Sequence, residues 1–124
     1  MATVVTNAGR AIASGRMTGS SPSQAEPKYL GWGTGAGTAA AADTTLSTET
    51  GSRVAGTGAQ ATTTVTNDTY RVTGTITASG SVTITNAGTF DASSSGNLMV
   101  HGDFTGVALA SGESIAFTVD VKFG

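Results

Sequence analysis

His101 is the only histidine of the chain, and Asp103 follows it by two residues. In an extended strand, residues two apart project from the same face, so these two side chains are placed to pair. Some hydrolases use a histidine paired with a carboxylate. Such a catalytic site also needs a nucleophile and an oxyanion hole. Because catalytic histidines usually come with identifiable partners, we favour a solvated His101 on an outer or interface face and predict no catalytic residue.

The remaining groups that carry chemistry are dispersed. The eight carboxylates lie mostly in predicted loops, and no pair has the spacing of a glycosidase site or of a calcium loop. The chain has no cysteine, which excludes disulfides and thiolate metal sites. The sequence leaves open the alternative that surface oxygen ligands bind a cation fortuitously. We therefore predict no cofactor and no dedicated metal site.

A glycine-rich run covers residues 31–37, with glycine at every second position. The run lacks the Gly-Lys-Ser/Thr ending of a phosphate-binding P-loop and misses the Gly-x-Gly-x-x-Gly spacing of dinucleotide-binding proteins. Such a segment either turns sharply or lets another backbone approach closely. We therefore interpret it as a structural element, with a turn as the favoured form.

Five residues are candidates for contact with a partner. Tyr29 and Trp32 flank the glycine-rich run, where an aromatic side chain either anchors a partner or fills the core, and the core is favoured for so small a domain. Arg71 and Lys122 project from predicted solvent faces, where plain solvation is the default. His101 completes this set of predicted partner contacts.

The elements that position these residues are mainly strands. Residues 114–123 alternate between large apolar side chains and small or polar ones, which is the pattern of a strand with one buried face. From residue 51 onward we predict about seven to nine short strands separated by turn signals, as in an antiparallel sandwich or jelly roll. They include a hairpin of residues 60–66 and 69–78 around a two-residue link at 67–68, a turn at 86–88, a flexible loop at 93–96, a strand at 98–104 and a short strand at 107–109.

The first residues follow a different pattern. Residues 3–6 predict a short strand, and Asn7 is placed to cap a short helix that continues through Met17. Residues 38–50 predict an extended loop held to the core by Leu46 alone. We expect a single all-β domain, an antiparallel β-sandwich and specifically a jelly roll, over residues 28–124, with residues 1–27 as an N-terminal strand, short helix and loop arm.

Composition narrows the class of protein. Only 11% of residues are charged, the net charge is −2 and the pI is about 5.0, so no basic patch suggests binding to nucleic acid or to an anionic membrane. Thr is the most abundant residue; it favours strands while its hydroxyl tolerates solvent. The N-terminus lacks the pattern of a signal peptide, and no apolar run is long enough to span a membrane. We expect synthesis and assembly in a cytoplasm.

Several segments resemble small structural proteins of tailed bacteriophages. They are residues 28–38 (KYLGWGTGAGT), 49–54 (ETGSRV), 86–91 (NAGTFD), 95–100 (SGNLMV) and 112–123 (GESIAFTVDVKF). The resemblance covers nearly the whole chain, and it implies a virion component assembled in the host cytoplasm. The favoured implication is a capsid cement, or decoration, protein that binds the major capsid protein and stabilises the assembled head, as a homo-oligomer such as a dimer or trimer. The alternative is a tail or fibre component involved in host-surface attachment. A small enzyme is disfavoured, because no convergent acid/base pair is present.

Overall fold

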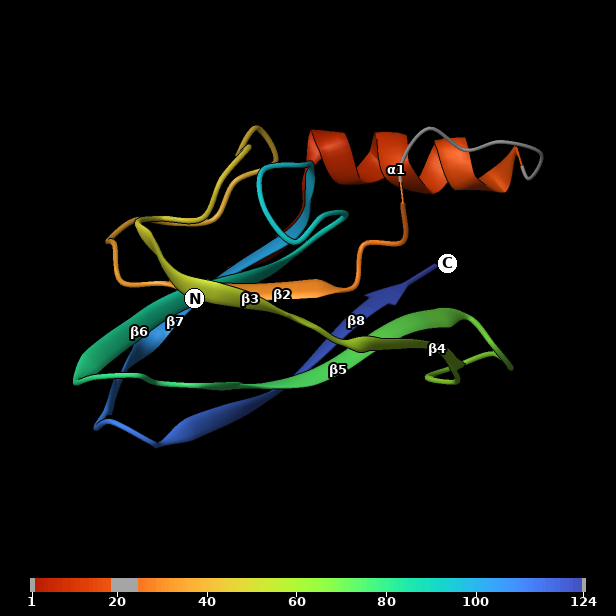
Figure 1. Ribbon diagram of the computed structural model, residues 1–124. Coiled ribbons are helices and arrows are strands. Elements are labelled where there is room, and N and C mark those ends of the chain that lie inside the picture. The colour runs from red at the N-terminus through yellow and green to blue at the C-terminus, as the bar shows by residue number, and fades with distance from the viewer. Residues whose placement is uncertain (1, 19–24, 124) are drawn as a thin grey trace.

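The computed structural model describes residues 2–18 and 25–123. Its elements are listed here in chain order: β1 (Thr3–Val5), α1 (Asn7–Met17), β2 (Tyr29–Gly33), β3 (Glu49–Ala55), β4 (Thr57–Ala61), β5 (Thr69–Thr77), β6 (Val82–Phe90), β7 (Leu98–Leu109) and β8 (Ser114–Lys122). The strands form a five-stranded sheet in the order β1-β7-β6-β2-β3 and a three-stranded sheet in the order β4-β5-β8. Every strand pair in these sheets is antiparallel. Figure 1 shows the two sheets as separate layers, with α1 lying near the C-terminal end of β8.

This arrangement confirms the all-β prediction and is consistent with a sandwich, but jelly-roll connectivity is not confirmed. The main core lies between the sheets, where side chains of β2 and β6 meet those of β5. It consists of Leu30, Trp32, Val72, Ile76, Ala78, Ile84 and Ala87. The predicted alternation of β8 is also confirmed. Ile115, Phe117 and Val119 pack against this core, whereas the intervening residues are exposed.

The N-terminal segment is hydrogen-bonded to the five-stranded sheet. Strand β1 pairs with β7 in the register Val4 to His101, and helix α1 buries Ile12 against Met99 and Val100. The helix cap lies one residue earlier than predicted, because the side chain of Thr6, not that of Asn7, accepts the Gly9 amide. Thr6 can take this role because it has extended backbone angles and is itself fully buried. The predicted boundary at residue 27 stays a prediction.

Three predictions of local structure are wrong. Residues 86–88 do not turn but continue β6, since Asn86 finds its hydrogen-bond partners in another segment. Residues 98–109 form one strand, not two. The β4–β5 link is longer than two residues, and the Asp68 carboxylate organises it by accepting three backbone amides. The apolar face predicted for residues 114–123 is also too long by one residue, since Phe123 lies beyond the end of β8 and is 48% exposed.

The predicted anchoring of the loop at residues 38–50 by Leu46 is confirmed. Leu46 is buried and packs with Phe90 and Leu98 in a small core of its own. The loop backbone then runs so close to β2 that a Cβ on Gly33 would clash with the carbonyl oxygen of Ser47. The glycine-rich run therefore serves close backbone approach, the less favoured of the two structural alternatives.

Candidate functional site

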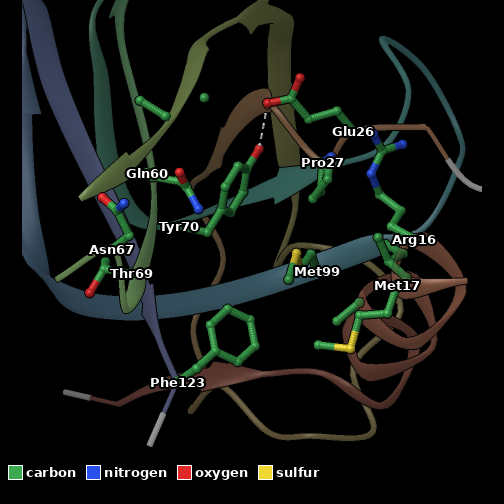
Figure 2. A pocket seen from close by; sticks show the side chains of 14 residues that line it. Arg16, Met17, Glu26, Pro27, Gln60, Asn67, Thr69, Tyr70, Met99 and Phe123 are labelled. Carbon is green, nitrogen blue, oxygen red and sulfur yellow. Dashed lines mark hydrogen bonds between the residues drawn. The ribbon is translucent and has the colours of Figure 1, made fainter. Parts of the chain in front are cut away.

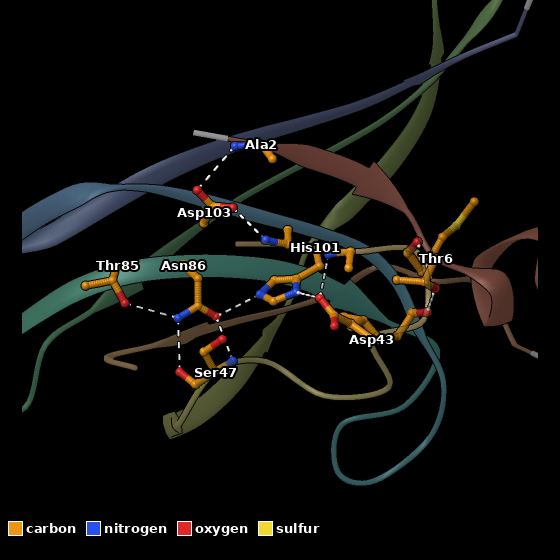
Figure 3. Close-up of polar contacts among 12 residues, drawn as sticks. Ala2, Thr6, Asp43, Ser47, Thr85, Asn86, His101 and Asp103 are labelled. Atoms are coloured by element: carbon orange, nitrogen blue, oxygen red, sulfur yellow. Dashed lines mark hydrogen bonds and ion pairs between the residues drawn. The ribbon is translucent and has the colours of Figure 1, made fainter. Parts of the chain in front are cut away.

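His101 is buried, so the prediction of a solvated histidine is wrong. Its side chain is in a polar cluster inside the fold and only 2% of the residue is exposed (Figure 3). The Nδ1 atom lies 2.7 Å from Oδ2 of Asp43, and Nε2 lies 3.1 Å from Oδ1 of Asn86. Both partners come from segments distant in sequence, which a strand pattern cannot reveal.

The orientation of the Asn86 amide follows from its other contacts. Its Oδ1 accepts the backbone amide of Ser47 at 3.0 Å, and its Nδ2 donates to the carbonyl of Ser47 at 3.0 Å. The amide cannot be reversed without placing donor against donor and acceptor against acceptor. Its Oδ1 is therefore an acceptor facing Nε2 of His101, while Asp43 presents an acceptor to Nδ1. Both ring nitrogens thus face acceptors, and these two contacts fix the orientation of the imidazole ring.

The two carboxylates near His101 have separate tasks. Asp43 accepts the backbone amide of Ala40, and this bond, followed by the His101 side chain, lowers the pKa of Asp43 below its ordinary value. Asp103, the predicted partner of His101, accepts the backbone amides of Ala39 and Ala2 instead. These contacts, that of Ala39 foremost, lower the pKa of Asp103. The cluster therefore joins the 38–50 loop and the N-terminal strand to β6 and β7. Its role is to hold these two segments in position.

The two aromatic candidates are part of the core to different degrees. Trp32 is 3% exposed and meets Phe117 edge to face, with ring centroids 6.4 Å apart. Tyr29 is half-buried beside the small core of Leu46 and Phe90. The favoured alternative, that Trp32 belongs to the core, is confirmed. That Tyr29 and Trp32 contact a partner stays a prediction.

The two basic candidates lie on the outer face of the three-stranded sheet. Arg71 on β5 forms a two-pronged ion pair with Asp120, its cross-strand neighbour on β8, at 2.7 and 2.8 Å. This pairing raises the pKa of Arg71 and lowers that of Asp120. Lys122 is exposed and donates to Thr64. Their contact with a partner also stays a prediction.

A groove of about 590 Å³ lies between α1 and the ends of β4, β5 and β8 (Figure 2). Its floor carries Ile12 and Met99, and its rim carries Met17 and Phe123, which are 75% and 48% exposed. The hydroxyl of Tyr70 donates to Glu26 at 2.9 Å across it. Burial and this acidic partner raise the pKa of Tyr70, so the phenol stays a neutral donor.

A second groove, of about 580 Å³, lies between β3 on one sheet and β5 with its following turn on the other. It is more polar than the first, because hydroxyl-bearing side chains and glycines provide most of its lining. Trp32 also lines this β3–β5 groove. No local pattern in the sequence indicates this groove, because its two walls belong to different sheets.

Within residues 2–18 and 25–123, no group of three or more histidine or acidic side chains is placed to hold a metal ion. In the same part of the chain, no helix has the length and apolar character needed to cross a membrane.

A small two-sheet sandwich in which a buried histidine, a buried asparagine and two partly buried carboxylates bind other parts of the same chain has the features of a structural or interaction protein. Comparison with known families agrees and is more specific. Residues 4–120 match the family described as podophage GP4 fiber I protein gp80, and the chain belongs to this family. No curated protein and no solved structure gives a significant match.

The family membership confirms the predicted resemblance to bacteriophage structural proteins. The chain is a phage structural protein with a β-sheet architecture, of a kind found in the virion. The family description names a fibre protein and no catalytic activity. It favours the fibre alternative over the cement role, which is not confirmed.

Proposed function

We propose that this chain is a non-enzymatic subunit of a phage fibre and takes part in attachment to the host surface. The observation that carries the proposal is the family match over nearly the whole chain, to a family described by a fibre role. The predicted cement role has no comparable support.

The sheet edges offer a physical route to assembly. Strand β8 is a nine-residue edge strand of the three-stranded sheet, and β1 covers only residues 100–102 of the twelve-residue strand β7. Neither β7 nor β8 contains proline, and the only lysine in them is Lys122. Strands without such protection readily pair with another chain. We therefore propose that copies of this chain associate into a dimer or trimer within the fibre, after synthesis in the host cytoplasm.

The test is to locate and count the protein in purified virions. Antibody against the folded chain, detected with gold particles, should label fibres and leave the head unlabelled. Quantitative mass spectrometry should find far fewer copies than of the major capsid protein. Uniform labelling of the head, with a copy number comparable to that of the capsid protein, would reject the fibre role and restore the cement role.

A further inference from the structure

The β3–β5 groove contains a hydrogen-bond donor that the fold leaves unused. Trp32 is 3% exposed and lines the groove. The Nε1–H of Trp32 donates to no other described residue, although every fully buried side-chain nitrogen or oxygen in the described part of the chain has a partner. The Nε1 atom is therefore not sealed, and an acceptor in the groove can reach it.

Gly51 keeps this donor accessible. Its φ is +71°, a conformation that residues with side chains rarely adopt, and an added Cβ would lie 3.6 Å from Nε1 of Trp32. A side chain at position 51 would therefore crowd the indole N–H from the groove side. With glycine there, the wall beside the donor is bare backbone.

The described residues that line the groove leave no charge free. Among them, Arg53 is the only charged residue. The guanidinium donates to Glu49 at 2.7 and 3.0 Å and to the carbonyls of Ala92 and Ser95 at 2.9 and 2.7 Å. It also stacks on Phe90, 3.4 Å from the ring centroid. The groups left to meet a ligand are hydroxyls, backbone and the indole N–H, which suit a neutral molecule rich in both donors and acceptors.

We propose that the β3–β5 groove binds a neutral, hydroxyl-rich saccharide, with Nε1 of Trp32 donating to one of its oxygens. The volume of about 580 Å³ is in the usual range for small-ligand sites. Hydroxyl-bearing residues of both sheets, such as Ser52 on β3 and Thr75 on β5, are exposed and line the groove. The inference deepens the proposed attachment role and rests on it only for its biological setting.

The sequence itself provides the probe, because Trp32 is the only tryptophan. The ¹⁵N-labelled chain therefore gives a single indole N–H signal in an NMR spectrum. We would titrate it with glucose, galactose, mannose, N-acetylglucosamine, maltotriose and chitotriose, up to about 10 mM, which saturates most of a site with a Kd of about 1 mM. At least one saccharide should shift the indole signal saturably, and glucuronic acid, the charged control, should bind more weakly. No shift with any of them, or equal binding of the acid, would overturn the proposal.

Two variants locate the binding. Trp32→Phe keeps an aromatic core residue but removes the donor, and Ser52→Tyr places bulk at an exposed lining position. Both should reduce binding at least tenfold, measured from the saccharide signals, whereas Thr66→Tyr in the exposed β4–β5 link, at the end of β5 far from the groove, should not. Wild-type binding by Ser52→Tyr would overturn the assignment even if Trp32→Phe fails to fold. Fibre labelling without saccharide binding would reject this inference alone, and binding by a chain located on the head would reject only the fibre role.

Discussion

Replacing Asn86 with alanine should be among the most destabilising single changes in this protein. Asn86 is 1% exposed and bonds the amide and carbonyl of Ser47 and Nε2 of His101, at 3.0, 3.0 and 3.1 Å. Each hydrogen bond contributes about 0.5–1.5 kcal/mol net, so losing three costs roughly 2–4 kcal/mol. Domains of this kind have a total stability of about 5–15 kcal/mol. The Asn86→Ala variant should therefore lose a large share of its stability while remaining able to fold.

The assay is chemical unfolding followed by circular dichroism, with thermal melting in parallel. The melting temperature should fall by roughly 10 °C, since 1 kcal/mol corresponds to a few degrees for a domain of this length. Asn7→Ala is the matched control, because Asn7 is exposed and its side chain bonds only Arg10 among the described residues. The control should change stability by less than about 0.5 kcal/mol. If Asn86→Ala also costs less than about 1 kcal/mol, the cluster does not hold the loop and the reasoning is refuted.

Three other predictions concern the same scaffold. The lowered pKa of Asp43 means that its carboxylate contributes stability that is fully present above the ordinary pKa of 3.8 and is lost as the pH falls through the lowered pKa. Asp43→Asn should therefore flatten the stability profile between about pH 5 and about pH 2, and an unchanged profile would contradict this. Leu46→Ala empties the small core under the loop and should cost about 2–5 kcal/mol in unfolding experiments, whereas a cost below 1 kcal/mol would mean that the loop is not anchored there. Thr6→Ala removes the helix cap and the hydroxyl that donates to the carbonyl of Leu98. It should lower the free energy of unfolding by about 1–2 kcal/mol and expose the amides of α1 to hydrogen exchange. Full protection of those amides would refute the capping role.

Strands with local alternation were predictable from the sequence. The faces of β5 and β8 follow from period-two patterns that each strand carries by itself, and Val72 and Ile76 are buried as their positions require. The anchoring of the 38–50 loop was predictable for a related reason, since Leu46 is its only large apolar residue. Membership of a phage structural family was also visible in the sequence, because turn and strand motifs along the whole chain carry it.

The polar site was decided by tertiary structure. His101 belongs to a strand whose pattern suggested a wet face, but Asp43 and Asn86 lie 58 and 15 residues away and meet it only after the sheet has formed. Residues 86–88 have the composition of a turn, yet they form a buried strand because Ser47 satisfies the Asn86 amide from another segment. The β3–β5 groove likewise exists only where two sheets face each other. Local sequence determines which face of a strand is apolar; the partners of a buried polar group depend on long-range packing.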